Sequence, residues 1–382
     1  MNGMTTIGER AGVWTAPGRA NLMGEHTDYN QGLVLPFAIA QSVTATAVRR
    51  DDGLLALRSR QAPAGSGTIA LDSLAPGTVT GWAAYPAGVA WALRDAGYQI
   101  PGATIDISSD VPVGAGLSSS AGLECATALA LTGLAGRSVP RRELVEIARR
   151  AENDFIGVPS GIMDQSASLL CEAGHALLLD CGTREISQVP FDPAAAGIGL
   201  LVINTRAEHA HAGGGYARRR AECEQAARQL RVPFLGVLTD PADAGRLADP
   251  VLRGRARHVI TDNARVLAAV DLLRGASGDP DVYRKIGVLL CEAHRSLRDD
   301  FEISWPEADV TVDAATAAGA LGARMIGGGF GGSVLALVPV DVGPVVRAAV
   351  ADAFARLSWA APEFIETIPS GGAARADSGS VR

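Results

Sequence analysis

Residues 113–124 read VGAGLSSSAGLE, and of the three glycine- and serine-rich segments in this chain it is the most informative. It follows an apolar stretch at residues 103–108 and opens a helix-like run at residues 121–134. A loop of small residues at the start of a helix offers free backbone N–H groups and the positive end of the helix dipole. The pattern therefore predicts a binding site for an anion such as phosphate.

Three serines stand together in this loop, directly after two glycines and a leucine. One hydroxyl among Ser118, Ser119 and Ser120 could simply cap the helix, as serine commonly does. Because three hydroxyls exceed that need, we expect one to reach a phosphate oxygen and one to ligate Mg²⁺. Glu152 could supply a carboxylate to the same ion, although taken alone it would be interpreted as a surface residue at a helix end.

Two further segments are rich in glycine and polar residues. Residues 18–36 read GRANLMGEHTDYNQGLVLP, and residues 326–333 read IGGGFGGS. The first places Arg19, Glu25 and His26 close to Asp28, which is more polar chemistry than a turn needs. Together with the anion site, these segments indicate a kinase that acts on a polyhydroxyl substrate.

Other nucleotide and nucleophile motifs fit poorly. Gly327, Gly329 and Gly332 satisfy G-x-G-x-x-G, but that fingerprint follows a strand and opens a helix, whereas here we expect a preceding helix and a following strand. A Walker A loop needs a lysine, and the single lysine, Lys285, falls in an expected helix. The G-x-S-x-G pattern of a nucleophile elbow does not occur.

Composition limits the class of protein. A chain of 382 residues with 47% hydrophobic residues and a net charge of −7 predicts two globular domains, or one large one, with little electrostatic support for nucleic-acid binding. The sequence holds no uncharged apolar stretch of 18 residues and no evident signal peptide, so we expect no membrane association. Five scattered cysteines without a C-x-x-C motif favour reduced thiols in a cytoplasmic protein.

The spacing of hydrophobic residues predicts helices and strands along the chain. The N-terminal part should hold strands over residues 33–41 and 42–49 and a helix over residues 82–96. In the C-terminal half, strands are expected at residues 334–339 and 364–369, and the tail after Pro369 should fray. Residues 191–197 form the best candidate domain boundary. Helices are expected in this half over residues 215–230, 253–274, 281–298, 306–320 and 344–357.

The three segments resemble the three motifs of the GHMP small-molecule kinases, and residues 18–36 resemble the signature of the galactokinase branch. Residues 160–165 (SGIMDQ), taken with Glu152, are similar to the catalytic segment of that family. Residues 204–223 resemble its second sugar-binding segment, and residues 294–307 a helix-and-turn marker. The similarity covers nearly the whole chain.

The resemblance implies an α+β fold with two domains. Residues 1–195 would form a ribosomal-S5-like N-terminal domain that carries the sugar signature and the phosphate loop. Residues 196–382 would form a ferredoxin-like C-terminal domain. ATP and the sugar would meet in the cleft between them.

The resemblance also implies roles in the sugar site. Arg19 would approach the C1 hydroxyl and Asp164, the family's candidate catalytic base. Glu25 and His26 would bind the C6 hydroxyl, and Asp28 the C3 and C4 hydroxyls. Ionised carboxylates suit such a ligand because a sugar offers several hydrogen-bond donors.

The resemblance implies two further contacts with the sugar. Gly161, in the catalytic segment, would lie against the substrate, and Tyr216 would lie near the C4 hydroxyl. Three departures from the family pattern bear on the range of sugars: His211 replaces an aliphatic residue, residues 213–215 are all glycine, and Trp305 replaces a smaller residue.

The resemblance also implies which residues would bind ATP and the metal ion. Trp82 would pack near adenine, Ser120 and Glu152 would ligate Mg²⁺, and Gly328 and Gly329 would approach the ligands from the other domain. The loop residues expected to cradle the phosphates are Gly114, Gly116, Leu117, Ser118, Ser119 and Ser120.

The activity implied is ATP-dependent phosphorylation of α-D-galactose at its C1 hydroxyl. Asp164 would either take the C1 proton or only orient the hydroxyl. A non-catalytic galactose sensor is the alternative from another class; such sensors lose a Ser-Ala pair that is intact here as Ser120 and Ala121. A kinase for N-acetylgalactosamine or arabinose is the alternative within the class. No obligate protein partner is implied.

Overall fold

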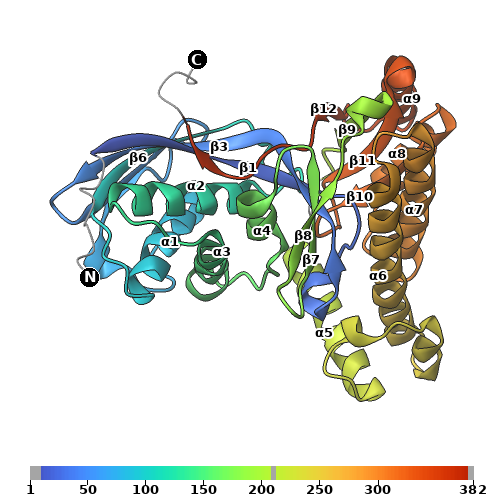
Figure 1. Ribbon diagram of the computed structural model, residues 1–382, viewed down its shortest axis with the longest axis horizontal. Helices are drawn as coiled ribbons and strands as arrows, with labels where there is room; N and C mark the ends of the chain where they lie inside the picture. The colour runs from blue at the N-terminus through green and yellow to red at the C-terminus, as the bar shows by residue number, and fades with distance from the viewer. Residues whose placement is uncertain (1–9, 208–211, 377–382) are drawn as a thin grey trace.

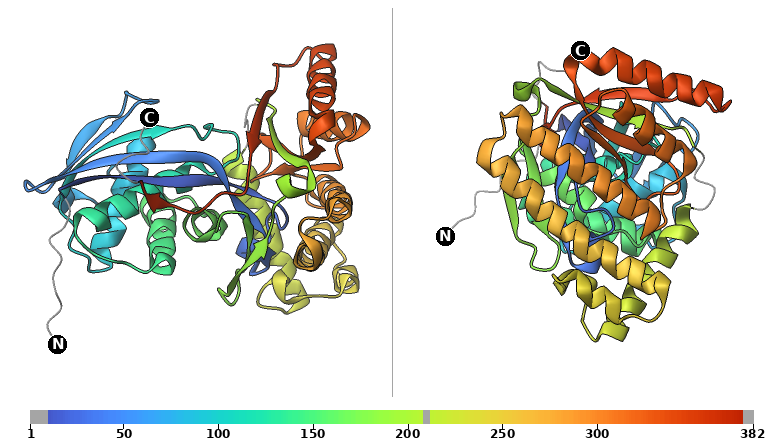
Figure 2. Two further views of the ribbon diagram at one scale, coloured as in Figure 1. Left: turned by 45° about the horizontal axis from the view of Figure 1, so that its top comes forward. Right: turned by 90° about the vertical axis from the view of Figure 1, so that its right-hand side faces the viewer.

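The computed structural model describes residues 10–207 and 212–376, and these form an elongated molecule built around two main sheets (Figure 1). The larger sheet lies in the part formed by the first half of the chain. The smaller lies among the long helices of the second half (Figures 1 and 2). The fold is α+β, as expected.

The larger sheet has six strands. β1 pairs antiparallel with β3, with a register shift between Pro17 and Arg19, and β4 pairs parallel with β6. The expected break between residues 41 and 42 was wrong: residues 36–50 form one long strand, which pairs with β1 on one side and β6 on the other. Residues 33–34 form the short strand β2 of another sheet. In spatial order the strands are β13 (Ala374–Arg375), β1 (Ala11–Asn21), β3 (Pro36–Arg50), β6 (Gly102–Ser109), β4 (Leu54–Ser59) and β5 (Gly67–Ala70).

Four helices lie along one side of this sheet (Figure 1). The predicted helix over residues 82–96 is confirmed, although its start is a 3₁₀ turn at Gly81–Ala83. α3 continues into a π-helical turn, Ala151–Ile156, which carries Glu152. The four helices are α1 (Ala84–Asp95), α2 (Ser119–Leu134), α3 (Arg141–Arg150) and α4 (Met163–Leu170).

The second main sheet is antiparallel and has the order β10–β11–β9–β12. A third, three-stranded sheet lies near the junction of the two halves, in the order β2–β7–β8. The strands are β9 (Ile198–Asn204), β10 (Gly322–Ile326), β11 (Ser333–Pro339), β12 (Glu363–Thr367), β2 (Leu33–Val34), β7 (His175–Asp180) and β8 (Ile186–Pro190).

The predicted helices of the second half are confirmed, with ends that differ by a few residues. Asp249 and Asp279 cap α6 and α7, where each accepts a hydrogen bond from a backbone N–H and a proline stands in the first turn. The helices are α5 (Ala212–Leu230), α6 (Pro250–Ala276), α7 (Pro280–Asp299), α8 (Pro306–Ala317) and α9 (Gly343–Arg356).

The last described strand returns to the first sheet. β13 pairs antiparallel with β1, with Trp14 opposite Arg375, so the expectation that the whole tail after Pro369 frays was wrong. The other five strands of that sheet come from before residue 195, and all four strands of the second sheet come from after it. The division into residues 1–195 and 196–382 stays a prediction. Within the described ranges, no helix is long and apolar enough to cross a membrane.

Candidate active site

Two of the three motif segments, residues 18–36 and 326–333, line a cavity of about 180 Å³ together with residues 158–164, which include most of the catalytic segment. Each residue that the sequence assigned to sugar binding or catalysis contributes to its wall. Its lining residues are Arg19, Glu25, His26, Asp28, Val158, Pro159, Ser160, Gly161, Met163, Asp164, Tyr216, Gly327 and Gly328.

Arg19 and Asp164 form a two-pronged ion pair in this cavity. Arg19 lies near the end of β1 and Asp164 in the first turn of α4. The Arg19 Nε donates to Asp164 Oδ1 at 2.8 Å, and Nη2 donates to Oδ2 at 3.1 Å. Arg19 Nη1 also donates to the Gly116 carbonyl at 2.6 Å, which ties the pair to the serine loop. Such bidentate, charge-assisted bonds fix orientation as well as position.

The Ser118 hydroxyl donates to Asp164 Oδ2 at 2.5 Å. Ser118 stands at the N-cap of α2, yet its side chain makes no capping bond. A capping serine normally has an extended backbone, whereas Ser118 is left-handed with φ of 55°. The capping interpretation was therefore wrong for Ser118, and its hydroxyl instead connects the loop to the candidate catalytic residue.

Glu152 is buried, unlike the surface residue that its position alone would suggest. Its Oε1 accepts a long hydrogen bond of 3.5 Å from Ser120 Oγ, and Oε2 accepts bonds from Ser160 Oγ at 2.6 Å and Gln165 Nε2 at 2.9 Å. Burial raises the pKa of Glu152 above its usual range. The π-helical turn widens the helix at this point, and such turns often occur at functional sites.

A second buried carboxylate lies behind Glu152, and sequence reasoning gave it no role. Gln165 Nε2 also donates to Glu124 Oε2 at 3.0 Å, and Glu124 is fully buried in α2. Burial raises the pKa of Glu124 well above its usual range. A lone acid within the apolar run at residues 121–134 was the available signal.

The serine loop is held by the second half of the molecule. Gly114 and Gly116 adopt φ of 76° and 72°, which glycine reaches without strain. Ser333, at the start of β11, donates to the Ala115 carbonyl at 2.6 Å. A Cβ on Gly327 would lie 3.3 Å from the Gly116 oxygen, so the two glycine loops lie close together.

The glycine loop at residues 327–332 connects β10 to β11. The expectation of a preceding helix was wrong, because the short apolar run GARMI forms a strand. The loop opens no helix, so the dinucleotide fingerprint still fails. Gly328 lines the cavity, whereas Gly329 packs on Ile303, whose oxygen would lie 2.6 Å from a Cβ at Gly329.

Trp82 lies outside the sugar cavity, in the 3₁₀ turn before α1. Its indole N–H donates to the Ala64 carbonyl at 3.2 Å. The neighbouring Ala83 lines a separate cavity of about 350 Å³, whose wall also includes Gly65 and Thr80. None of the serine-loop residues lines that cavity.

Glu25 and His26 connect the sugar segment to the glycine loop. Glu25 Oε1 accepts from Arg324 Nη2 at 3.1 Å and from Gly327 N at 2.9 Å. Burial lowers the pKa of His26 to about 3, so the ring is neutral. Its two nitrogens contact the Gly328 carbonyl at 3.2 Å and the Tyr29 hydroxyl at 2.8 Å. We assign the proton to Nε2, because only a donor can pair with a carbonyl.

Asp28 faces the cavity from a short 3₁₀ turn, Asp28–Asn30. Burial raises its pKa to about 6, with nearby Asp164 and Glu25 acting in the same direction. A Cβ on Gly161 would lie 1.6 Å from Asp28 Oδ2, so only glycine fits beside this carboxylate. The Tyr216 ring lies 5.1 Å from the His26 ring, centroid to centroid.

Two residues of α6 hold the sugar segment from behind, and sequence reasoning missed both. Asp262 Oδ2 accepts from the backbone N–H groups of Gly24 at 3.1 Å and Glu25 at 3.2 Å. His258 Nε2 lies 3.0 Å from the Glu25 carbonyl. Both are fully buried. Their spacing of four residues on the same helix face as buried Val266 was a usable signal.

Two of the three departures from the family pattern lie in described parts of the chain. Trp305 is buried, and its indole N–H donates to Thr205 Oγ1 at 3.1 Å. A Cβ on Gly215 would lie 2.6 Å from the Phe330 ring, so the glycine permits close packing there. His211 lies outside the described residues.

Comparison with known proteins gives three family matches. Residues 84–172 match the GHMP kinase N-terminal domain, and residues 282–356 match the GHMP kinase C-terminal domain. Residues 4–50 match the galactokinase galactose-binding signature. The chain is therefore a kinase of the GHMP class, with that class's N- and C-terminal domains.

Full-length relatives narrow the class. The chain is 50% identical to a galactokinase of Streptomyces coelicolor over 97% of this chain and 98% of that protein. It is 45% identical to a galactokinase of Mycobacterium tuberculosis over 94% of this chain and 98% of that one. The solved structure of Lactococcus lactis galactokinase complexed with galactose superposes with a TM-score of 0.90 at 34% identity, covering 96% of each chain. The chain belongs to the galactokinase family.

Proposed function

We propose that this protein transfers the γ-phosphoryl group of ATP to the C1 hydroxyl of α-D-galactose. The observation that carries the proposal is the hydrogen-bonded group formed by Arg19, Asp164 and Ser118. It joins a cavity lined by the sugar-signature residues to a loop built to hold phosphate. Phosphoryl transfer needs an acceptor hydroxyl beside the donor phosphate, and alignment supplies much of the rate.

The cavity offers acceptors and donors that suit a hexose. Asp28 and Glu25 present carboxylate oxygens, and Arg19 presents N–H groups beside Asp164. His26 uses both ring nitrogens within the protein, so a sugar hydroxyl would bind this ring only by replacing one of those bonds. We therefore assign the C6 hydroxyl to Glu25 first, with His26 as the group that fixes the Gly328 carbonyl.

The serine loop suits the ATP phosphates and one Mg²⁺. Ser120 and Glu152 offer a hydroxyl and a carboxylate on one side of the loop, and Mg²⁺ typically takes one or two such protein ligands together with phosphate oxygens. The described ranges hold no cluster of three or more His, Cys, Asp or Glu side chains placed for a metal. This fits an ion held jointly by protein and nucleotide. When bound, Mg²⁺ offsets negative charge on the transferring phosphoryl group.

Asp164 is the group we assign to the C1 hydroxyl. Arg19 and Ser118 hold its carboxylate through three hydrogen bonds, which leaves it little rotational freedom. In that position it accepts a hydrogen bond from the C1 hydroxyl, and then its proton as the bond to phosphorus forms. Arg19 would stay paired throughout and keep the carboxylate oriented.

The proposal is tested by a panel of sugars with ATP, measuring kcat/KM by coupled ADP release. Galactose should give the highest value, and arabinose should fall well below it because it lacks the C6 hydroxyl assigned to Glu25. N-acetylgalactosamine tests the room around C2. Sugar-free ATP hydrolysis is the control. Galactose binding without ADP release would favour a sensor, and equal turnover of all sugars would contradict the proposed recognition.

We further propose that the reaction takes place in the cytoplasm. All five cysteines are free thiols in the structure, and four of them are buried. Unpaired cysteines are usual in compartments that keep thiols reduced. Fractionation of cells that produce the protein, with marker enzymes for each compartment, tests this assignment.

A further inference from the structure

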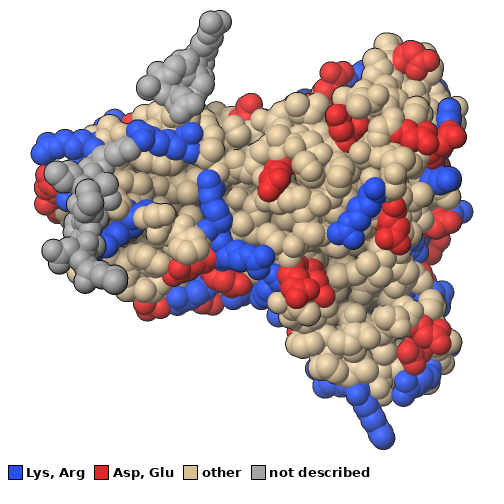
Figure 3. Space-filling model, in the orientation of Figure 1, with Lys and Arg blue, Asp and Glu red and all other residues tan. Residues whose placement is uncertain are grey.

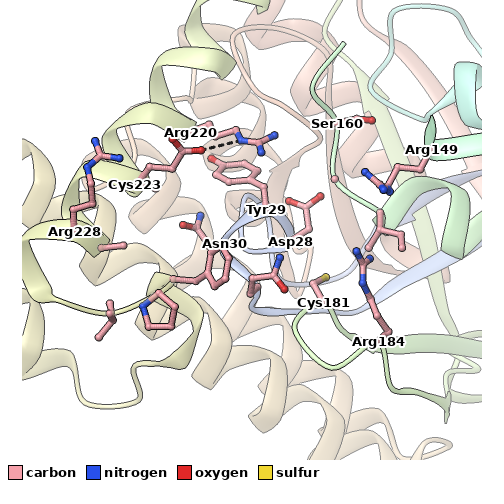
Figure 4. A pocket seen from close by; sticks show the side chains of 18 residues that line it. Asp28, Tyr29, Asn30, Arg149, Ser160, Cys181, Arg184, Arg220, Cys223 and Arg228 are labelled. Carbon is pink, nitrogen blue, oxygen red and sulfur yellow. Dashed lines mark hydrogen bonds and ion pairs between the residues drawn. The ribbon is translucent and has the colours of Figure 1, made fainter. Parts of the chain in front are cut away.

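A second cavity, of about 320 Å³ (Figure 4), shares lining residues with the sugar cavity. Four arginines line it and come from three elements: Arg149 from α3, Arg184 from the β7–β8 turn, and Arg220 and Arg228 from α5. In Figure 4 the two pairs of arginines stand on opposite sides, with Asp28 between them. The acidic lining residues are Asp28 and Glu224, so positive groups outnumber negative ones in a chain of net charge −7.

These arginines keep donors that the protein does not use. Within the described ranges, the Arg228 side chain makes no hydrogen bond or ion pair. Arg149 donates through Nε to Glu146 at 2.9 Å. Arg184 approaches Glu146 only at 3.9 Å. Arg220 pairs with Glu224 at 3.3 Å, donates through Nη1 to the Pro159 carbonyl at 3.4 Å and lies over the Tyr29 ring. Like charges gathered around one hollow repel one another, and a bound anion relieves that repulsion.

The two cavities share a wall. Asp28, Ser160 and Gly161 line both of them. An anion among the arginines would therefore lie near the carboxylate that we assign to sugar hydroxyls. Two negative groups in such proximity oppose one another, and this coupling acts equally in both directions.

We propose that this arginine cavity, lined by Arg149, Arg184, Arg220 and Arg228, binds a phosphate dianion, as inorganic phosphate or as the phosphate group of a sugar phosphate. Arginine is the side chain best suited to hold phosphate oxygens in a bidentate manner. Occupancy weakens galactose binding through Asp28. The site itself does not depend on the proposed function, whereas its effect on galactose does.

The first experiment titrates the full chain with inorganic phosphate by calorimetry, with ionic strength held constant by sodium chloride. Saturable binding is expected, and the double variant Arg184→Gln/Arg228→Gln should weaken it by about tenfold or more, since each charge-assisted bond contributes substantially. The matched control is Arg295→Gln/Arg356→Gln, which removes the same charge from exposed arginines that do not line this cavity. A second arm uses a sugar phosphate in the presence of saturating galactose.

The outcomes separate the possibilities. Phosphate binding that only the first double variant loses supports the site, and saturation by the sugar phosphate alone identifies a phosphate monoester as its ligand. Equal loss in both double variants, or no saturable binding in either arm, overturns the proposal. In the wild type, phosphate should raise the Kd for galactose about fivefold, within the usual range of coupling between sites. A Kd that phosphate leaves unchanged contradicts the coupling, and galactose that does not bind at all refutes the proposed function instead.

Discussion

At the scale of single residues, Asp164 accepts three side-chain hydrogen bonds in the cavity. Arg19 and Ser118 hold its carboxylate from two elements, β1 and the serine loop. Asp164→Asn keeps the shape but removes the proton acceptor, so we expect kcat to fall by roughly 10²–10⁴. The measurement is steady-state ADP release at saturating galactose and ATP, with thermal unfolding to verify the fold. Turnover close to the wild-type value would show that Asp164 only orients the hydroxyl.

Asp28 should make the affinity for galactose depend on pH. Burial raises its pKa to about 6, and the ionised form is the one that accepts hydrogen bonds from sugar hydroxyls. Galactose affinity should therefore be constant above pH 7 and fall as the pH drops through 6, approaching tenfold per unit below it. Calorimetric titration with galactose from pH 5 to 8 measures this. Asp28→Asn should bind weakly at every pH, and a slope that persists in this variant would point to another group.

At the scale of elements, α6 supports the sugar segment through residues that do not line the sugar cavity. Asp262 accepts two consecutive backbone N–H groups, those of Gly24 and Glu25. Asp262→Asn weakens these two hydrogen bonds, because an amide oxygen carries no full charge. We expect the KM for galactose to rise severalfold while the KM for ATP changes little. Initial-rate kinetics with each substrate varied in turn separates the two.

A control on the same helix isolates that effect. Asp271 is exposed on α6, and Asp271→Asn makes the same chemical change away from the sugar segment. Both KM values should stay at the wild-type level in this variant. Equal increases of both KM values in Asp262→Asn would instead indicate a general loss of structure.

Elements with a strong period could be predicted from the sequence, and those set by partners could not. The amphipathic run of α7 and its Asp-Pro start define its ends within one residue. β10 was missed because GARMI holds five residues and a lone arginine, and it becomes a strand only by pairing with β11. The long β3 was divided in two because local composition does not show that β1 and β6 pair along its full length.

Among the residues of the candidate site, too, some could be predicted from the sequence and others could not. Residues that contact a ligand through polar groups stand out in short motifs, as Arg19 and Asp28 do. Residues that hold those groups in place, such as Asp262 and His258, lie far away in sequence and are recognised only once the chain is folded. Ser118 stood out in its motif, but its contact could not be predicted, because it depends on a left-handed backbone that the local sequence does not fix.

At the scale of the whole molecule, buried polar contacts connect the two halves across the sugar cavity. Glu25 pairs with Arg324 of β10, and His26 contacts the Gly328 carbonyl. β13 carries the end of the chain back to β1. Relative movement of the halves would therefore change the sugar site itself, which gives the junction a direct influence on galactose binding.

The Glu25–Arg324 pair tests this link between stability and binding. Both side chains are almost fully buried. Arg324→Met leaves the Glu25 carboxylate without its cation, so we expect a loss of about 3–5 kcal/mol in the free energy of unfolding. Adding Glu25→Gln removes the unpaired charge and should restore much of that loss. Galactose affinity should stay low in both variants, because the acceptor is displaced in one and neutralised in the other. Urea unfolding and calorimetry measure the two quantities, and an Arg324→Met protein of wild-type stability would show that this pair does not hold the halves together.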